Sequence, residues 1–125
     1  MALADEVREL LYKIRLGEDS SIEFKAVSFK GDKIDGPHRD SLAQEIAAFA
    51  NARGGDVLLG VVDRTRQVTG IPLARLDAVE TFVRGVLARI EPQPTVFLRR
   101  LELPDQAGVQ HPIMRIQVPR SLFRA

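Results

Sequence analysis

The chain of 125 residues contains no cysteine and no tryptophan, and aromatic side chains make up only 6% of it. Without cysteine, a disulfide framework, a cysteine-ligated zinc site, a thiol nucleophile and a redox dithiol are all excluded. A chain of this length buries about two-thirds of its unfolded surface, so it needs no crosslink or structural metal to fold. We therefore expect residues 1–125 to form a single domain around an ordinary hydrophobic core.

Long hydrophobic runs are also absent, since no stretch approaches the roughly 20 apolar residues that a membrane-spanning helix needs. The N-terminus, Met-Ala-Leu-Ala-Asp-Glu, is acidic and lacks the basic start of a signal peptide. We therefore expect a cytoplasmic protein that does not contact membranes. The sequence contains none of the motifs of P-loop nucleotide sites, α/β-hydrolases, zinc proteases or dinucleotide-binding folds.

The net charge of +1 conceals an uneven distribution along the chain. Residues 1–63 hold 8 basic and 12 acidic side chains (8 − 12 = −4), whereas residues 64–125 hold 10 and 5 (10 − 5 = +5). All ten basic residues of the second half are arginine, whose planar guanidinium suits phosphate. Charge alone leaves two interpretations open, which are a surface that binds a polyanion and a solvated arginine-rich surface.

Hydrophobic periodicity predicts a mixed α+β fold in the order α-β-α-β-β-α-β-β. The helices are expected at residues 4–15, from 40 or 41 to 53, and 73–90. The strands are expected at residues 21–29, 56–63, 68–71, 95–103 and 112–119. Residues 30–38 contain turn-forming and charged residues, so we expect a loop there. The almost wholly apolar segment 56–63 predicts a central strand that is buried on both faces.

Three carboxylates are candidates for a metal site: Glu18, Glu23 and Asp63. Glu23 lies on the polar side of the first predicted strand beside Lys25, and Asp63 ends the central strand. Glu18 can meet Glu23 only if the chain curls back, which Gly17 permits. Converging carboxylates suit a hard cation such as Mg²⁺ or Mn²⁺. The alternative is that both glutamates face solvent and Asp63 only caps a turn.

Three segments together resemble the Schlafen-type AlbA-like domain. The segments are Glu18-Asp-Ser-Ser-Ile-Glu23-Phe-Lys25, then Ala47-Ala-Phe-Ala-Asn51-Ala-Arg-Gly-Gly55 with its following strand to Asp63, and Val68-Thr-Gly70. The similarity covers about residues 16–119. The family is described as DNA-binding. In bacteria such domains often lie at the N-terminus of larger proteins that are described as transcriptional regulators.

The resemblance implies nucleic-acid binding and a specific site. In animal Schlafen proteins the related domain has a three-carboxylate, metal-dependent RNase site that acts on tRNA and rRNA. Glu18, Glu23 and Asp63 match its carboxylates, and Lys25 matches a lysine that could contact phosphate. The resemblance thus implies an endoribonuclease that uses Mg²⁺ or Mn²⁺. The alternatives are a non-catalytic DNA-binding module of a transcriptional regulator and a plain interaction or oligomerisation domain.

Two further expectations concern partners. The candidate nucleic-acid contacts are Lys25, Arg64, Arg66, Arg99, Arg100 and Arg115. Family members usually continue beyond residues 118–121 into another strand, so we expect an unpaired sheet edge near residues 113–118. A homodimer could cover that edge, through either the first helix or the apolar residues of the edge strand, which are Met114, Ile116 and Val118.

Overall fold

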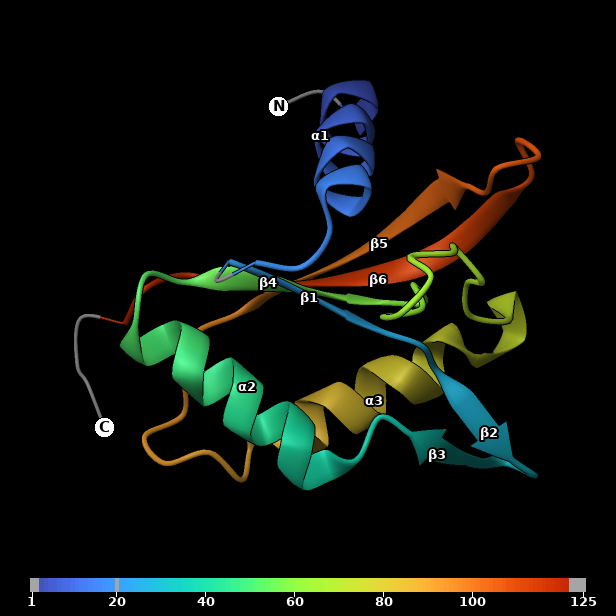
Figure 1. Cartoon of the computed structure of the whole chain (residues 1–125). Helices are drawn as coiled ribbons and strands as arrows, with labels where there is room; N and C mark the ends of the chain where they lie inside the picture. Colours follow the sequence, from blue (N-terminus) through green and yellow to red (C-terminus); the bar gives the residue numbers. More distant parts are fainter. Residues whose placement is uncertain (1–2, 20, 122–125) are drawn as a thin grey trace.

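A four-stranded sheet lies at the centre of the fold, and helices cover both of its faces (Figure 1). The computed structural model describes residues 3–19 and 21–121. In chain order the elements are α1 (Leu3–Leu16), β1 (Ile22–Lys25), β2 (Ser28–Lys30), β3 (Lys33–Gly36), α2 (Arg39–Asn51), β4 (Gly55–Leu59), a 3₁₀ turn (Leu73–Arg75), α3 (Leu76–Leu87), β5 (Phe97–Pro104) and β6 (Gln110–Val118). The strand order is β1-β4-β6-β5, in which β1 and β4 are parallel and the other neighbours are antiparallel.

The central strand β4 divides the core into two layers, because successive side chains of a strand point to opposite faces. Val57 and Leu59 pack towards α2 and α3, whereas Leu58 packs towards α1 on the other face. All three side chains are fully buried, which confirms the prediction of a central strand buried on both sides. No helix within residues 3–19 and 21–121 is long and apolar enough to span a membrane.

The mixed α+β class is confirmed, and the elements follow in the expected order, with local differences. The expected strand 21–29 is two strands, β1 and β2, in separate sheets, and the central strand ends at Leu59, so Asp63 lies in the turn that follows it. Residues 30–38 are not only a loop, because β3 pairs with β2 in a hairpin. This hairpin places Phe29 opposite Ile34, and both side chains pack against the core. Residues 68–71 form no strand; only Val68 makes an isolated bridge, to Val61.

The expected unpaired edge near residues 113–118 is wrong. Strand β6 lies inside the sheet, where β4 pairs with one side and β5 with the other. Met114, Ile116 and Val118 are buried against α2 and α3, so they cannot form the contact of a dimer. The edges of the four-stranded sheet are β1 and β5. The homodimer itself stays a prediction.

Packing explains both glycines between α2 and β4. Gly54 has a φ of +82°, a conformation that side chains rarely adopt, and a Cβ there would lie 2.6 Å from the carbonyl oxygen of Val118. A Cβ on Gly55 would lie 2.5 Å from the ring of Phe49. The pair therefore lets β4 start close to both α2 and the end of β6.

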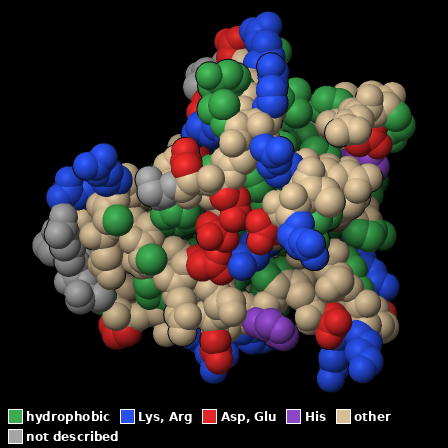
Figure 2. All heavy atoms as spheres, in the orientation of Figure 1, with side chains coloured by type: hydrophobic (Ala, Val, Ile, Leu, Met, Phe, Trp, Pro, Cys, Tyr) green, Lys and Arg blue, Asp and Glu red, His purple; other side chains and the backbone are tan. Residues whose placement is uncertain are grey.

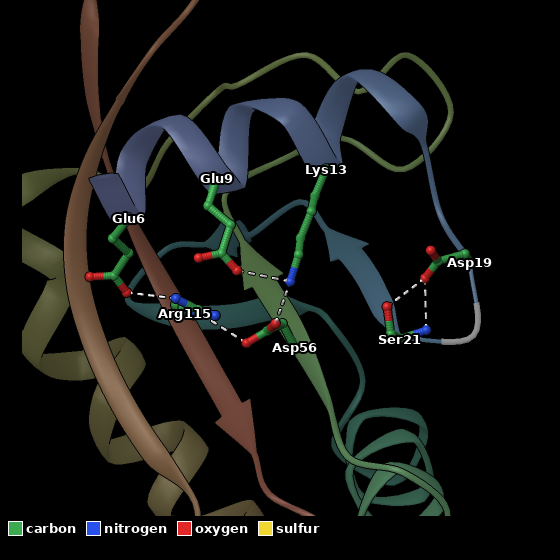
Figure 3. Close-up of polar contacts among 7 residues, drawn as sticks. All are labelled: Glu6, Glu9, Lys13, Asp19, Ser21, Asp56 and Arg115. Atoms are coloured by element: carbon green, nitrogen blue, oxygen red, sulfur yellow. Dashed lines mark hydrogen bonds and ion pairs between the residues drawn. The ribbon is translucent and has the colours of Figure 1, made fainter. Parts of the chain in front are cut away.

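A buried ion-pair network holds α1 against the sheet (Figure 3). Arg115 of β6 is only 6% exposed; its Nε donates to Asp56 Oδ1 at 2.8 Å and its Nη1 to Glu6 Oε2 at 2.7 Å. Arg99 Nη2 lies 2.7 Å from the other oxygen of Glu6, and Lys13 Nζ lies 3.5 Å from Asp56 Oδ2. These charges connect α1 to β4, β5 and β6, and apolar side chains of α1 complete the contact.

We expect Arg115→Ala to destabilise the fold by about 3–5 kcal/mol, because it leaves the buried carboxylates of Glu6 and Asp56 without their shared partner. Urea denaturation followed by circular dichroism measures this loss. Arg53→Ala, at an exposed position, is the control and should change the free energy of unfolding by no more than about 0.5 kcal/mol. Equal stability of the two variants would contradict the structural role of the network.

Candidate functional site

Strand β1 presents two charged side chains to the α2 side of the sheet. Ile22 and Phe24 are buried under α1, so the alternating side chains of Glu23 and Lys25 point to the other face. Both are partly buried. This placement agrees with the alternation from which the sequence predicts a half-buried strand.

Glu45 of α2 joins this pair, and it is not among the site residues that the sequence predicts. Lys25 Nζ lies 2.7 Å from Glu45 Oε1 and 3.9 Å from Glu23 Oε2, and the carboxyl groups of Glu23 and Glu45 are hydrogen-bonded. Helical spacing was the signal in the sequence that could have placed Glu45 near the sheet. Glu45 directly precedes the buried Ile46 and follows the buried Leu42 by three positions. Glu45 therefore borders the face of α2 that packs on the sheet.

Glu18 and Asp63 meet beside the free edge of β1. Glu18 Oε2 accepts a hydrogen bond from the backbone N–H of Phe24 at 2.7 Å, and the carboxyl group of Glu18 also hydrogen-bonds that of Asp63. The chain turns sharply between α1 and β1, where Gly17 has a φ of +90° and Asp19 forms an isolated bridge to Ile22. The curl that the sequence analysis requires for Glu18 is therefore present.

We call Glu18, Glu23, Glu45 and Asp63 the carboxylate cluster. The charge of Glu18 acts on Glu23, which connects the two carboxyl pairs electrostatically. Figure 2 shows Asp and Glu side chains gathered at the centre of one face, with Lys and Arg side chains beside them. The cluster combines residues from α2, β1 and the segments that precede β1 and follow β4.

Crowded negative charge favours protonation of two of these carboxyls. The hydrogen bond with Glu45, together with burial and the charges of Glu45 and Glu18, raises the pKa of Glu23 from 4.5 to about 8, against the opposing charge of Lys25. Partial burial and the neighbouring Asp63 raise the pKa of Glu18, and they outweigh the hydrogen bond from Phe24. Glu23 therefore keeps its proton at neutral pH, which offsets part of the negative charge of the cluster.

The oxygen donors of the cluster suit Mg²⁺ or Mn²⁺ in chemistry, because both are hard cations that prefer carboxylates. Their arrangement fits less well. Within residues 3–19 and 21–121, no three His, Asp or Glu side chains converge closely enough to hold a metal ion. Glu18 and Asp63 do touch each other, and Glu23 touches Glu45 instead.

The predicted arginine contacts do not form one surface. Arg115 is buried in the network under α1, so we withdraw it as a nucleic-acid contact. Arg99 and Arg100 point to opposite faces of β5, where Arg99 pairs with Glu6 and Arg100 with acidic residues of α3. Arg64 is exposed in the turn next to Asp63. Arg66, in the same turn, donates from Nη1 to the carbonyl oxygen of Arg15 at 2.8 Å.

Comparisons with known proteins agree with this architecture. A family model described as Schlafen, AlbA_2 matches residues 18–125. Among solved structures, the chain is similar to the DIP2311 protein from Corynebacterium diphtheriae, with a TM-score of 0.55 and 20% sequence identity. That similarity covers 95% of this chain but 23% of the other, and it shows a shared fold alone. The family match begins at Glu18, directly after α1.

The raised pKa of Glu23 predicts a fold that loses stability as the pH rises. The folded state holds this proton up to about pH 8, whereas an unfolded glutamate releases it near 4.5, so stability falls between these values. Glu23→Gln keeps an uncharged partner for Glu45. In buffer with EDTA, we expect it to be about 1 kcal/mol more stable than wild type at pH 8.5 and equally stable at pH 5, after allowing for solvent screening.

Urea denaturation at both pH values checks this prediction. Glu102→Gln is the matched control, because Glu102 is an exposed carboxylate of β5, at the opposite edge of the sheet from β1. The control should keep the pH dependence of wild type. A Glu23→Gln variant with the same pH dependence as wild type would show that repulsion within the cluster does not strain the fold.

Proposed function

This chain belongs to the Schlafen AlbA_2 family, as the match over residues 18–125 shows, and from this premise we propose a function. We propose that the chain binds structured RNA such as tRNA and cleaves it with a divalent cation. The family relationship supports a role connected with nucleic acid. The single observation that carries the proposed cleavage is the contact between Glu18 and Asp63, which lie 63 − 18 = 45 positions apart in the sequence. Glu23 extends this pair into the carboxylate cluster.

Glu18 and Asp63 would hold Mg²⁺ or Mn²⁺ as a pair, and Glu23, which contacts Glu45, would complete the set only if the cation drew the carboxylates together. Such a cation lowers the pKa of a bound water and neutralises charge on a phosphate. The chain's own contribution is to bring these carboxylates together, and a bound cation would compete with the proton that Glu23 holds up to about pH 8. Lys25 supplies the positive charge of the cluster and is engaged by Glu45 and Glu23.

The cluster also limits how nucleic acid can approach. Carboxylates repel phosphates, so we expect the cation to be required for RNA to reach the cluster. Arg64 is placed to assist at its border, because its exposed side chain follows directly after Asp63. Cation-dependent RNA binding therefore accompanies the proposed cleavage.

A non-catalytic DNA-binding module is the second candidate. It is favoured by the lack of three converging carboxylates among the residues that the structure describes. Under this alternative, duplex DNA binds without Mn²⁺, and neutralising a carboxylate of the cluster leaves its affinity unchanged or improves it. Binding assays with DNA and RNA, each with and without Mn²⁺, separate the two candidates.

We expect Glu23→Gln and Asp63→Asn each to reduce cleavage of tRNA in Mn²⁺ by at least about 100-fold, because each removes a negatively charged oxygen donor. Circular dichroism should show an unchanged fold. The control Glu102→Gln removes a carboxylate from β5 and should cleave like wild type. Equal cleavage by wild type and both cluster variants would assign the activity to a contaminant.

RNA affinity should fall steeply with salt, since phosphate contacts release counterions. We expect Arg64→Ala to weaken binding similarly for different RNA sequences and to reduce the slope of log K against log salt by about 1. Fluorescence anisotropy across a salt series measures both effects. Arg84→Ala is the control, because Arg84 lies on α3 and pairs with Glu80. An unchanged slope for Arg64→Ala would remove Arg64 from the binding surface.

A further inference from the structure

The turn that follows β4 is fastened to the end of α1 by one arginine. Arg66 Nη1 donates to the carbonyl oxygen of Arg15 at 2.8 Å, across 51 positions of sequence. The backbone N–H of Arg66 donates to the carbonyl oxygen of Val62 at 2.7 Å, which closes the turn that contains Asp63. The guanidinium of Arg66 thus joins the turn of Asp63 to the segment that leads into Glu18.

The backbone of Arg66 is unusual. Its φ is +60°, and among residues 3–19 and 21–121 it is the only residue other than glycine with a positive φ. Side chains rarely adopt this conformation, and such residues often occur where function requires a particular geometry. Glycine would adopt this conformation more easily, so the arginine at this position draws attention to what its side chain contacts.

The end of α1 is shaped to receive this guanidinium. The last carbonyl groups of a helix lack partners within the helix, and a cation near them is favourable. Arg66 satisfies one of these carbonyls, that of Arg15. A Cβ on Gly17 would lie 3.1 Å from Arg66 Nη1, so glycine leaves the space that the guanidinium occupies. Gly17 is followed by Glu18, whose position therefore depends on the same contact.

We infer that Arg66 is a positioning residue that holds Glu18 against Asp63, rather than a phosphate ligand. The two carboxylates repel each other, so their contact requires that both backbone segments be fixed. The N–H of Phe24 orients the carboxylate of Glu18, and Arg66 fixes where the chain leaves α1 relative to the turn of Asp63. The inference rests on the proposed function only in assigning Glu18 and Asp63 to the cation site.

Hydrogen exchange at the amide of Phe24 tests the inference without metal or RNA, because this N–H is held by Glu18. Arg66→Gly removes the guanidinium and also relieves the backbone cost of a positive φ. We expect it to speed exchange of the Phe24 amide by about tenfold or more, measured by NMR, as the loss of a hydrogen bond to a carboxylate predicts. Core amides of β4 and β6 should keep their protection, which shows that the variant is folded.

Arg64→Gly is the matched control, since it removes a neighbouring exposed arginine of the same turn. It should leave exchange of the Phe24 amide unchanged, and Arg66→Lys should restore part of the protection. Mn²⁺ affinity, measured by calorimetry without RNA, should fall in Arg66→Gly and not in Arg64→Gly. Slower or unchanged Phe24 exchange in Arg66→Gly would overturn the inference, whatever the Mn²⁺ affinity of the variant.

The same variants separate failure of this inference from failure of the proposed function. If wild type binds no Mn²⁺, the proposed cation site is wrong, and Phe24 exchange still decides whether Arg66 positions Glu18. If Arg66→Gly changes only RNA affinity and its salt dependence, Arg66 is a phosphate ligand and the inference is wrong. Faster Phe24 exchange in Arg66→Gly alone supports it.

Discussion

The guanidinium of Arg115 lies between the sheet and α1, and its ion pairs with Glu6 and Asp56 determine where α1 rests. The position of α1 matters because its last turn leads directly into Gly17 and Glu18. A helix that shifted on the sheet would carry Glu18 away from Asp63 and away from the N–H of Phe24. The buried network therefore supports the carboxylate cluster from a distance.

The ion-pair network under α1 and the carboxylate cluster differ in how their charges are balanced. In the network under α1, oppositely charged groups alternate, so the buried charges are balanced. In the carboxylate cluster, Lys25 pairs with Glu23 and Glu45, and the pKa of Glu23 still rises to about 8. The first arrangement stabilises the fold, whereas the second keeps like charges close together, and a proton on Glu23 relieves part of their repulsion.

The arginine-rich second half of the chain illustrates why composition is a weak guide to a binding surface. Arg99, Arg100 and Arg115 pair with acidic residues of the first helix, of α3 and of β4. Arg66 donates a hydrogen bond to a carbonyl oxygen in the last turn of α1, that of Arg15. Arg99 and Arg115 thus balance acidic residues of the first half of the chain, whereas Arg100 pairs within the second half, and Arg64 is exposed in the turn beside the cluster.

Periodicity in the sequence was enough to predict the helices, the buried central strand and the placement of Glu23 and Lys25 on the polar face of β1. These features depend on neighbours within a few residues, which a sequence displays directly. The tertiary structure alone decided that β6 lies inside the sheet, that Glu45 joins the cluster, that Arg115 is buried and that Arg66 reaches α1. Each of these depends on contacts between segments distant in the chain, and residue type and local spacing carry no information about which distant segments meet.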